Sequence, residues 1–114
     1  MNNLRRGDVF FADLTGSEGH VIGYKKRPWI VVQNDMGNKF SPTTIVVPLT
    51  KRLKKPIPTH VKLVWGVIEG TVLAEQIRVV DQNVEFEVVE HLPPQIMKHV
   101  DRVVATAVGL DIKD

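Results

Sequence analysis

Arg27 and Thr50 are the two residues whose types and spacing most favour chemistry on a phosphate group. They open and close a stretch in which two apolar, strand-like runs flank a turn built from Asn34, Asp35, Gly37, Asn38 and Pro42. A hairpin returns its chain, so both residues are expected at one end of a small sheet. A guanidinium matches the geometry of a phosphate, and a threonine hydroxyl can hydrogen-bond to one. A second interpretation stays open, in which Arg27 is an ordinary surface arginine at a strand end and the Thr50 hydroxyl bonds to the backbone.

Other reaction chemistries lack their residues. The chain has no cysteine, which excludes disulfides, thiolate metal sites and a cysteine nucleophile. His60, His91 and His99 form no metal-ligand spacing. The sequence holds no nucleotide-binding glycine fingerprint or P-loop, and its serines lack the context of a nucleophile elbow. We therefore expect no metal and no cofactor.

RNA cleavage needs neither a metal nor a cofactor, because the 2′-hydroxyl of RNA supplies an internal nucleophile. The protein must orient that hydroxyl, stabilise charge on the phosphoryl oxygens and help the 5′-oxygen leave. Arg27 suits the second task, and Thr50 could hydrogen-bond the phosphate or the 2′-hydroxyl. Glu18 and His20, in a glycine-rich loop, could serve as acid or base, or could simply be solvated.

Several residues could contact RNA outside the reacting centre. Gln76 and Arg78 fall on one side of an alternating stretch, where a glutamine offers both a donor and an acceptor to a base; the alternative is an ordinary solvent-facing sheet surface. Trp29 and Trp65 could stack on bases or belong to the core. The densest positive clusters, which could also be solvated loops, are Lys51, Arg52, Lys54 and Lys55, and then Lys25, Lys26 and Arg27.

The elements that must position these residues are mostly strands. Apolar and alternating runs predict strands at residues 9–14, 28–34, 43–49, 59–65, 72–80 and 84–88. Residues 15–26 read as a long glycine-containing loop, and residues 51–58 as a basic loop. Helical spacing predicts an amphipathic helix from residue 95 to 108, entered through Pro93 and Pro94 and ended at Gly109.

So many short strands in so short a chain favour a mainly β fold, a small and strongly curved barrel with a C-terminal helix. The helix either packs on the barrel or serves a dimer. The 114 residues, with an apolar fraction of 43%, fit a single domain over residues 1–114. The formal charge of +2 is too mild to prove a nucleic-acid partner. Without a signal-peptide pattern or a long apolar run, we expect a cytoplasmic protein that does not span a membrane.

The sequence resembles the MazF/PemK/Kid family of toxin endoribonucleases over nearly its whole length. The matching motifs occur in the family's order, which is more specific than any single motif. They are Arg6-Gly7-Asp8-Val9 with Ala12-Asp13-Leu14, Arg27-Pro28, Gln33-Asn34-Asp35 with Gly37-Asn38, Ser41-Pro42-Thr43, Pro58-Thr59-His60-Val61, and Glu75-Gln76-Ile77-Arg78 with Asp81.

The resemblance implies an SH3-like barrel of the CcdB/PemK type that acts as a homodimer. It implies metal-independent, sequence-selective cleavage of single-stranded RNA, leaving a 2′,3′-cyclic phosphate and a 5′-hydroxyl, and inhibition by a cognate MazE-like antitoxin. Arg27 and Thr50 match the family's catalytic arginine and threonine. Gln76 matches its RNA-contacting glutamine, and His60 a histidine for which a groove contact is expected. Lys25, Lys26 and Lys51 are expected to add phosphate contacts.

One motif departs from the family. Typical members carry Gly-Ser-Glu-Gln-Gly-Gly shortly before the arginine, whereas here Gly16-Ser17-Glu18 lies nearer the first strand. A catalytic role for Glu18 is therefore the weakest assignment. Two other functions stay open on the same barrel: a toxin of the gyrase-poisoning CcdB type, and a protein-interaction module without nuclease activity.

Overall fold

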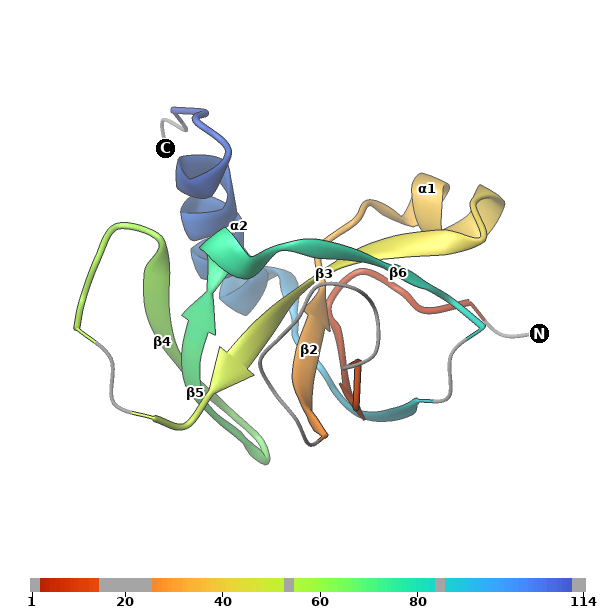
Figure 1. Ribbon diagram of the computed structural model, residues 1–114, viewed down its shortest axis with the longest axis horizontal. Helices are drawn as coiled ribbons and strands as arrows, with labels where there is room; N and C mark the ends of the chain where they lie inside the picture. Colours follow the sequence, from red (N-terminus) through yellow and green to blue (C-terminus); the bar gives the residue numbers. More distant parts are fainter. Residues whose placement is uncertain (1–2, 15–25, 53–54, 84–85, 112–114) are drawn as a thin grey trace.

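The computed structural model describes residues 3–14, 26–52, 55–83 and 86–111, and the predicted 15–26 loop lies mostly outside them. Its elements follow the chain in Figure 1 as β1 (Asp8–Ala12), β2 (Arg27–Val31), α1 (Asp35–Phe40), β3 (Thr43–Thr50), β4 (His60–Trp65), β5 (Ile68–Leu73), the 3₁₀ turn η1 (Ala74–Gln76), β6 (Arg78–Asp81), β7 (Glu87–His91) and α2 (Pro94–Ala107). The strands pair antiparallel in the order β4-β5-β3-β2-β1-β7, and β6 also pairs with β3. The predicted mainly β fold with one C-terminal helix is confirmed.

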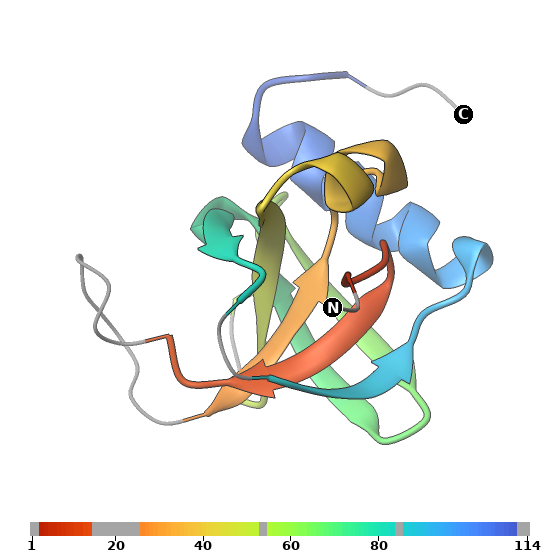
Figure 2. The same ribbon diagram turned by 90° about the vertical axis from the view of Figure 1, so that its right-hand side faces the viewer.

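The sheet curls into a half-barrel whose central strands are buried on both faces (Figures 1 and 2). Val9, Ile30 and Val47 belong to a core shared with α2. Their sequence neighbours Phe10, Trp29 and Val46 point the other way, into a second core. Successive side chains of a strand alternate between faces, so a strand covered on both sides needs apolar residues at every position. The continuous apolar runs of β1, β2 and β3 follow from this, whereas β4 alternates because one face is exposed.

The C-terminal helix packs on the barrel. Met97, Val100 and Val103 are buried in the first core, and α2 contacts η1 and β4. Pro94 opens the helix, and Gly109 follows it with a φ of 82°. The Leu110 N–H donates to the Ala105 carbonyl at 2.7 Å, which closes the helix as a Schellman-type cap. Of the two predicted uses of the apolar face, packing on the barrel is confirmed. No helix in the described part of the chain is long and apolar enough to span a membrane.

Two predicted elements were wrong. The predicted turn between β2 and β3 holds the short helix α1 at Asp35–Phe40, because the Asn34 side chain caps it by accepting the Gly37 N–H at 2.8 Å. The predicted strand at 72–80 is broken by η1, because β5 pairs with the end of β3 whereas β6 pairs with its beginning. The chain changes direction at η1, between the strand that pairs with the end of β3 and the strand that pairs with its beginning. Ala74 is therefore buried while Gln76 is exposed, and the predicted alternation of Ala74, Gln76 and Arg78 on one side does not hold.

The last predicted strand, at 84–88, is observed as β7 at Glu87–His91, and residues 84–85 lie outside the described residues. β7 pairs with β1 at the edge of the sheet. Gly7, just before β1, has a φ of 94°, and a Cβ there would lie 2.7 Å from the Leu92 carbonyl oxygen. Only glycine fits where the start of β1 meets the end of β7.

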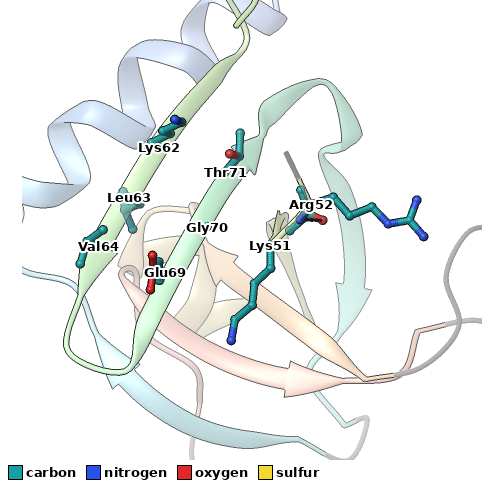
Figure 3. A pocket seen from close by; sticks show the side chains of 9 residues that line it. Lys51, Arg52, Lys62, Leu63, Val64, Glu69, Gly70 and Thr71 are labelled. Atoms are coloured by element: carbon teal, nitrogen blue, oxygen red, sulfur yellow. Dashed lines mark hydrogen bonds between the residues drawn. The ribbon is translucent and has the colours of Figure 1, made fainter. Parts of the chain in front are cut away.

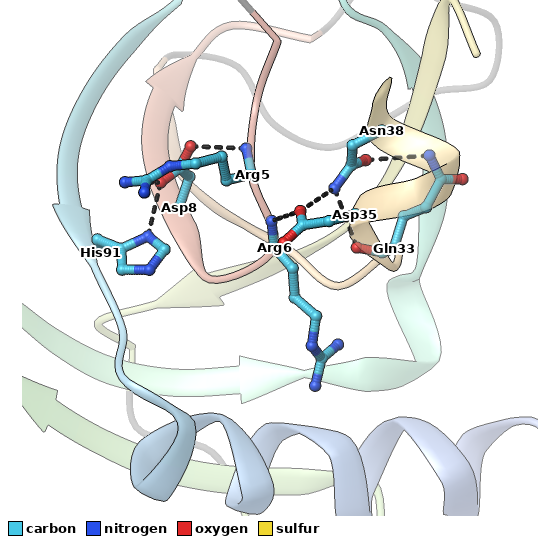
Figure 4. A network of polar contacts seen from close by, with 7 residues as sticks. All are labelled: Arg5, Arg6, Asp8, Gln33, Asp35, Asn38 and His91. Carbon is cyan, nitrogen blue, oxygen red and sulfur yellow. Dashed lines mark hydrogen bonds and ion pairs between the residues drawn. The ribbon is translucent and has the colours of Figure 1, made fainter. Parts of the chain in front are cut away.

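Polar side chains of the Arg6-Gly7-Asp8 and Gln33-to-Asn38 motifs stabilise the fold (Figure 4). Asn38 is 1% exposed; its amide donates to the Gln33 carbonyl and its oxygen accepts from the Gln33 amide and the Thr44 hydroxyl. Asp8, also buried, accepts the Arg5 N–H and bonds to His91 at 2.8 Å. These bonds satisfy groups that would be costly to bury unpaired, so the role of these motifs is structural.

Asp35 gives this network a pH dependence. The Arg6 backbone N–H donates to its carboxylate at 2.7 Å and lowers its pKa below the usual 3.8, outweighing an opposing desolvation effect, with further lowering by Asn38 and the charges of Arg5 and Arg6. A carboxyl with a lowered folded-state pKa stabilises the fold above its unfolded pKa and loses that contribution as pH falls through the folded value.

We therefore expect Asp35→Asn to cost less than about 1 kcal/mol at neutral pH, since the side chain is exposed and screened. The cost should vanish in acid, below the folded pKa of Asp35. Urea unfolding of both proteins at neutral and acid pH measures this, with the exposed Asp111→Asn as control. A difference in stability between parent and Asp35→Asn that does not change with pH would contradict the assignment.

Candidate phosphate-binding site

Arg27 and Thr50 lie at the same end of two adjacent antiparallel strands. Arg27 is the first residue of β2 and Thr50 the last of β3. The pairing of the two strands ends at Trp29 and Pro48, and Arg27 and Thr50 each lie two residues beyond that pair. Alternation puts Arg27 on the face of Trp29, and Thr50 on the face of Pro48 and Val46. The prediction that the hairpin brings both polar residues to one end is confirmed, and both are half-buried.

Two arginines pack against one tryptophan at this end. The Arg27 Cζ lies 5.6 Å from the centroid of the Trp29 ring, and the Arg78 Cζ lies 5.7 Å from it. Trp29 is 5% exposed and its Nε1–H donates to the Ala12 carbonyl at 3.3 Å, so the indole is fixed. Trp29 is thus a core residue that also orients two guanidinium groups, each contact contributing roughly 0.5–2 kcal/mol. Two guanidinium groups near one ring make this end of the sheet locally positive, which favours the approach of an anion.

Thr50 keeps a donor for such an anion. Its Oγ1 accepts the Arg52 backbone N–H at 3.2 Å, as expected from the reading in which the hydroxyl bonds to backbone. A hydroxyl has one hydrogen besides its two lone pairs, so that bond leaves the Thr50 O–H free to donate. The backbone contact fixes the direction of the side chain and is compatible with a role in binding.

A hollow of about 330 Å³ opens directly beside Thr50 (Figure 3). Its lining includes Lys51 and Arg52, which the sequence singled out as part of a positive cluster, and Lys62 and Thr71, which it did not. The full lining is Thr50, Lys51, Arg52, Lys62, Leu63, Val64, Glu69, Gly70 and Thr71. Lys62 lies in the 59–65 stretch whose alternation predicted a strand, but nothing in one strand indicates which residues of β3 and β5 it faces.

Gln76 and His60 belong to a neighbouring unit around η1. Gln76 is exposed at the end of the turn. The His60 ring lies 3.0 Å from a Glu75 carboxylate oxygen through Nε2 and 3.3 Å from the Lys55 carbonyl through Nδ1. Thr59 donates to the other Glu75 oxygen at 2.9 Å. Burial raises the pKa of Glu75, but hydrogen bonds from His60, its own backbone and Thr59 outweigh this and leave the pKa below its usual range.

His60 is therefore held by two protein partners, and its side chain is only 9% exposed. The contact fixes Glu75, the residue before Gln76, against the start of β4. Lys26 is exposed next to Arg27, whereas Glu18, His20 and Lys25 lie outside the described residues. Trp65, the other candidate for base stacking, packs partly against the first core. Among the described residues, no three or more histidines or carboxylates gather as metal ligands.

Comparison with known proteins places this arrangement in a family. Residues 5–108 match the PemK-like, MazF-like toxins of type II toxin–antitoxin systems. The endoribonuclease MazF of Staphylococcus saprophyticus is 40% identical over 112 residues, 94% of this chain and 92% of the relative. The endoribonuclease EndoA of Bacillus subtilis is 38% identical, with 94% and 96% covered.

Solved structures agree with the sequence comparison. A mycobacterial endoribonuclease in complex with its cognate antitoxin superposes with a TM-score of 0.79 at 28% identity, over 96% of this chain and 99% of that one. MazF from Deinococcus radiodurans, 23% identical, shares the fold with a TM-score of 0.78 over 96% and 100% of the two chains. The chain belongs to the PemK-like, MazF-like toxin family of type II toxin–antitoxin systems.

Proposed function

We propose that this protein is an endoribonuclease that cleaves single-stranded RNA without a metal ion, with Arg27 and Thr50 at the reacting phosphate. The observation that carries the proposal is the placement of Arg27 and Thr50 at the same end of β2 and β3, with Arg27 and Arg78 packed against one indole. Relatives with up to 40% identity are named endoribonucleases, which supports the same activity here.

The reaction is a transesterification. The 2′-oxygen of the nucleotide before the scissile bond attacks phosphorus and gives up its proton, while the bond to the 5′-oxygen breaks and that oxygen takes up a proton. The products are a 2′,3′-cyclic phosphate and a 5′-hydroxyl. Arg27 stabilises the charge that develops on the phosphoryl oxygens and assists proton transfer to the leaving oxygen. Thr50 donates its free O–H to the scissile phosphate.

The residues around this centre hold the RNA. Gln76, exposed at the end of η1, takes part in base recognition. His60 contacts the RNA groove and, through its bond to Glu75, holds the residue next to Gln76 in place. Lys26 and Lys51 add phosphate contacts, and Lys25 in the preceding loop does the same. Glu18 is the least supported member of the set, because its motif is displaced in the sequence.

We also propose that the protein works as a cytoplasmic homodimer and that a cognate MazE-like antitoxin inhibits it. A mycobacterial relative was solved with its cognate antitoxin, and MazE–MazF complexes are known for the Deinococcus fold neighbour. A toxin of the gyrase-poisoning type on the same barrel predicts no RNA product, and so does a protein-interaction module.

Incubation of the purified protein with single-stranded RNA in EDTA tests the function. We expect cleavage at a short recurring sequence, with cyclic phosphate and 5′-hydroxyl ends identified by mass spectrometry. Cleavage that requires an added divalent ion, or the absence of any product at high enzyme concentration, would refute the proposal.

Removal of the Thr50 hydroxyl should impair cleavage specifically. Thr50→Val keeps the side-chain shape and loses one hydrogen bond to a charged group, so kcat/KM should fall by about 10- to 100-fold. Thr50→Ser should restore most of the rate. Thr106→Val is the matched control, because Thr106 is exposed on α2 and its hydroxyl donates to the Arg102 carbonyl of the same helix. If Thr50→Val cleaved RNA as fast as Thr106→Val, Thr50 would have no role at the phosphate.

A further inference from the structure

Three side chains form a line across three strands on the face that carries Thr50. Thr50 of β3 pairs with Thr71 of β5, and Thr71 pairs with Lys62 of β4. Directly opposed residues of antiparallel strands point to the same face. At about 4.8 Å between strands, the line from Thr50 to Lys62 is roughly 10 Å long. All three residues line the hollow, and Figure 3 shows Thr71 and Lys62 on neighbouring strands.

The charge around this line is predominantly positive. Lys51 and Arg52 stand at the Thr50 end and Lys62 at the other, against a single carboxylate, that of Glu69. Glu69 pairs in register with Val64 and not with Lys62. Within the ranges that the structure describes, none of the three cations forms an ion pair. Unpaired cations around a concave surface attract an anion.

We propose that this line is a second phosphate subsite, in which Lys62 binds the RNA phosphate next to the one held by Thr50. The inference rests on the proposed function, because Thr50 defines where the scissile phosphate lies. Thr71 forms the floor between the two positions, since it is 8% exposed and pairs with both neighbours. An ammonium group binds a phosphate as a point charge, without regard to the base. Lys62 therefore contributes to the affinity for RNA and to the position of the RNA strand in the site, and not to sequence preference.

An acidic segment of a protein partner would also fit a positive hollow. The continuity with Thr50 favours RNA, because an extended nucleic-acid strand has to leave the reacting centre along the surface, and this line begins there. The two ligands differ in what they predict for the salt dependence of RNA binding, because each phosphate contact to a single strand adds about 0.7 to the slope of log K against log salt.

The test measures binding of an RNA made uncleavable by a 2′-deoxy sugar at the cleavage site, over a range of salt concentrations. Lys62→Gln should lower the slope by about 0.7 and weaken binding roughly fivefold at 0.1 M salt, whatever the flanking bases. The control is Lys98→Gln, an exposed lysine on α2 outside the hollow, which should match the parent. A single neutral methylphosphonate then locates the contact. Placed at the phosphate next to the scissile one, it should weaken RNA binding by the parent and cause no further loss of affinity in Lys62→Gln.

Equal slopes for Lys62→Gln and Lys98→Gln would overturn the subsite. So would a Lys62→Gln protein that loses affinity for polyglutamate but not for RNA, which would assign the hollow to a protein partner. If the parent cleaves RNA in EDTA while Lys62→Gln behaves as the control, only this inference fails. If the parent neither binds nor cleaves RNA, the proposed function fails and the subsite with it.

Discussion

Replacement of Arg27 by alanine should reduce RNA cleavage by about 10²- to 10⁴-fold, the range for loss of a group that stabilises charge or assists proton transfer in a transition state. The guanidinium of Arg27, the first residue of β2, packs against Trp29 at the same end of the sheet as Thr50. Single-turnover cleavage of a defined RNA, with enzyme in excess, measures the effect on the chemical step.

Arg27→Lys is the matched variant. It keeps the charge but loses the planar fork of donors, so its rate should lie between those of the parent and Arg27→Ala. The fold should survive both changes, since the side chain is half-buried at a strand end and contributes on the order of 1 kcal/mol through its ring contact. Thermal unfolding checks this. Cleavage by Arg27→Ala at the parental rate would remove Arg27 from the mechanism.

Replacement of Asn38 by alanine should have the largest effect on stability. The side chain is 1% exposed and bonds to Gln33, Asp35 and Thr44 together. Its loss removes the acceptor of the hydroxyl of Thr44, a residue that is 0% exposed, and the side-chain donor to the Gln33 carbonyl. Each unsatisfied buried group costs about 1–3 kcal/mol. We expect a loss of about 3–5 kcal/mol and a melting temperature lower by roughly 10–20 °C.

The matched control is Asn83→Ala, because Asn83 is exposed in the turn after β6. It should melt within a few degrees of the parent. Unfolding in urea and by heat gives both numbers. If Asn38→Ala were as stable as Asn83→Ala, the network in Figure 4 would not stabilise the fold, and the structural role of this motif would be wrong.

The sequence predicted most strands because their burial leaves a local pattern. Ile30 and Val47 face one core while Trp29 and Val46 face the other, which makes apolar runs that are easy to recognise. The corner at η1 leaves no such pattern. It arises because β3 pairs with β5 at one end and β6 at the other, a condition set by a strand more than 20 residues earlier. α1 was missed for a different reason, since Asn34 suits both a turn and a helix cap.

The site was predictable to the extent that it lies within one hairpin. Arg27 and Thr50 lie at one end of the sheet because β2 and β3 are consecutive antiparallel strands, and the apolar runs between them fix the register. Arg78 and Lys62 reach the same region from β6 and β4, and only the assembled sheet places them there. His60 looked like a free groove residue in the sequence, but its contact with Glu75 depends on packing between β4 and η1.

The central claim is that a 2′-hydroxyl of RNA, held at Arg27 and Thr50, is the nucleophile. The most direct test replaces the single ribose before the scissile bond with 2′-deoxyribose and measures cleavage and binding in EDTA. Our account predicts that cleavage is abolished while affinity stays within a few-fold of that for the unmodified RNA. Cleavage of the modified strand at the normal rate would mean that water attacks the phosphate, and would contradict the account.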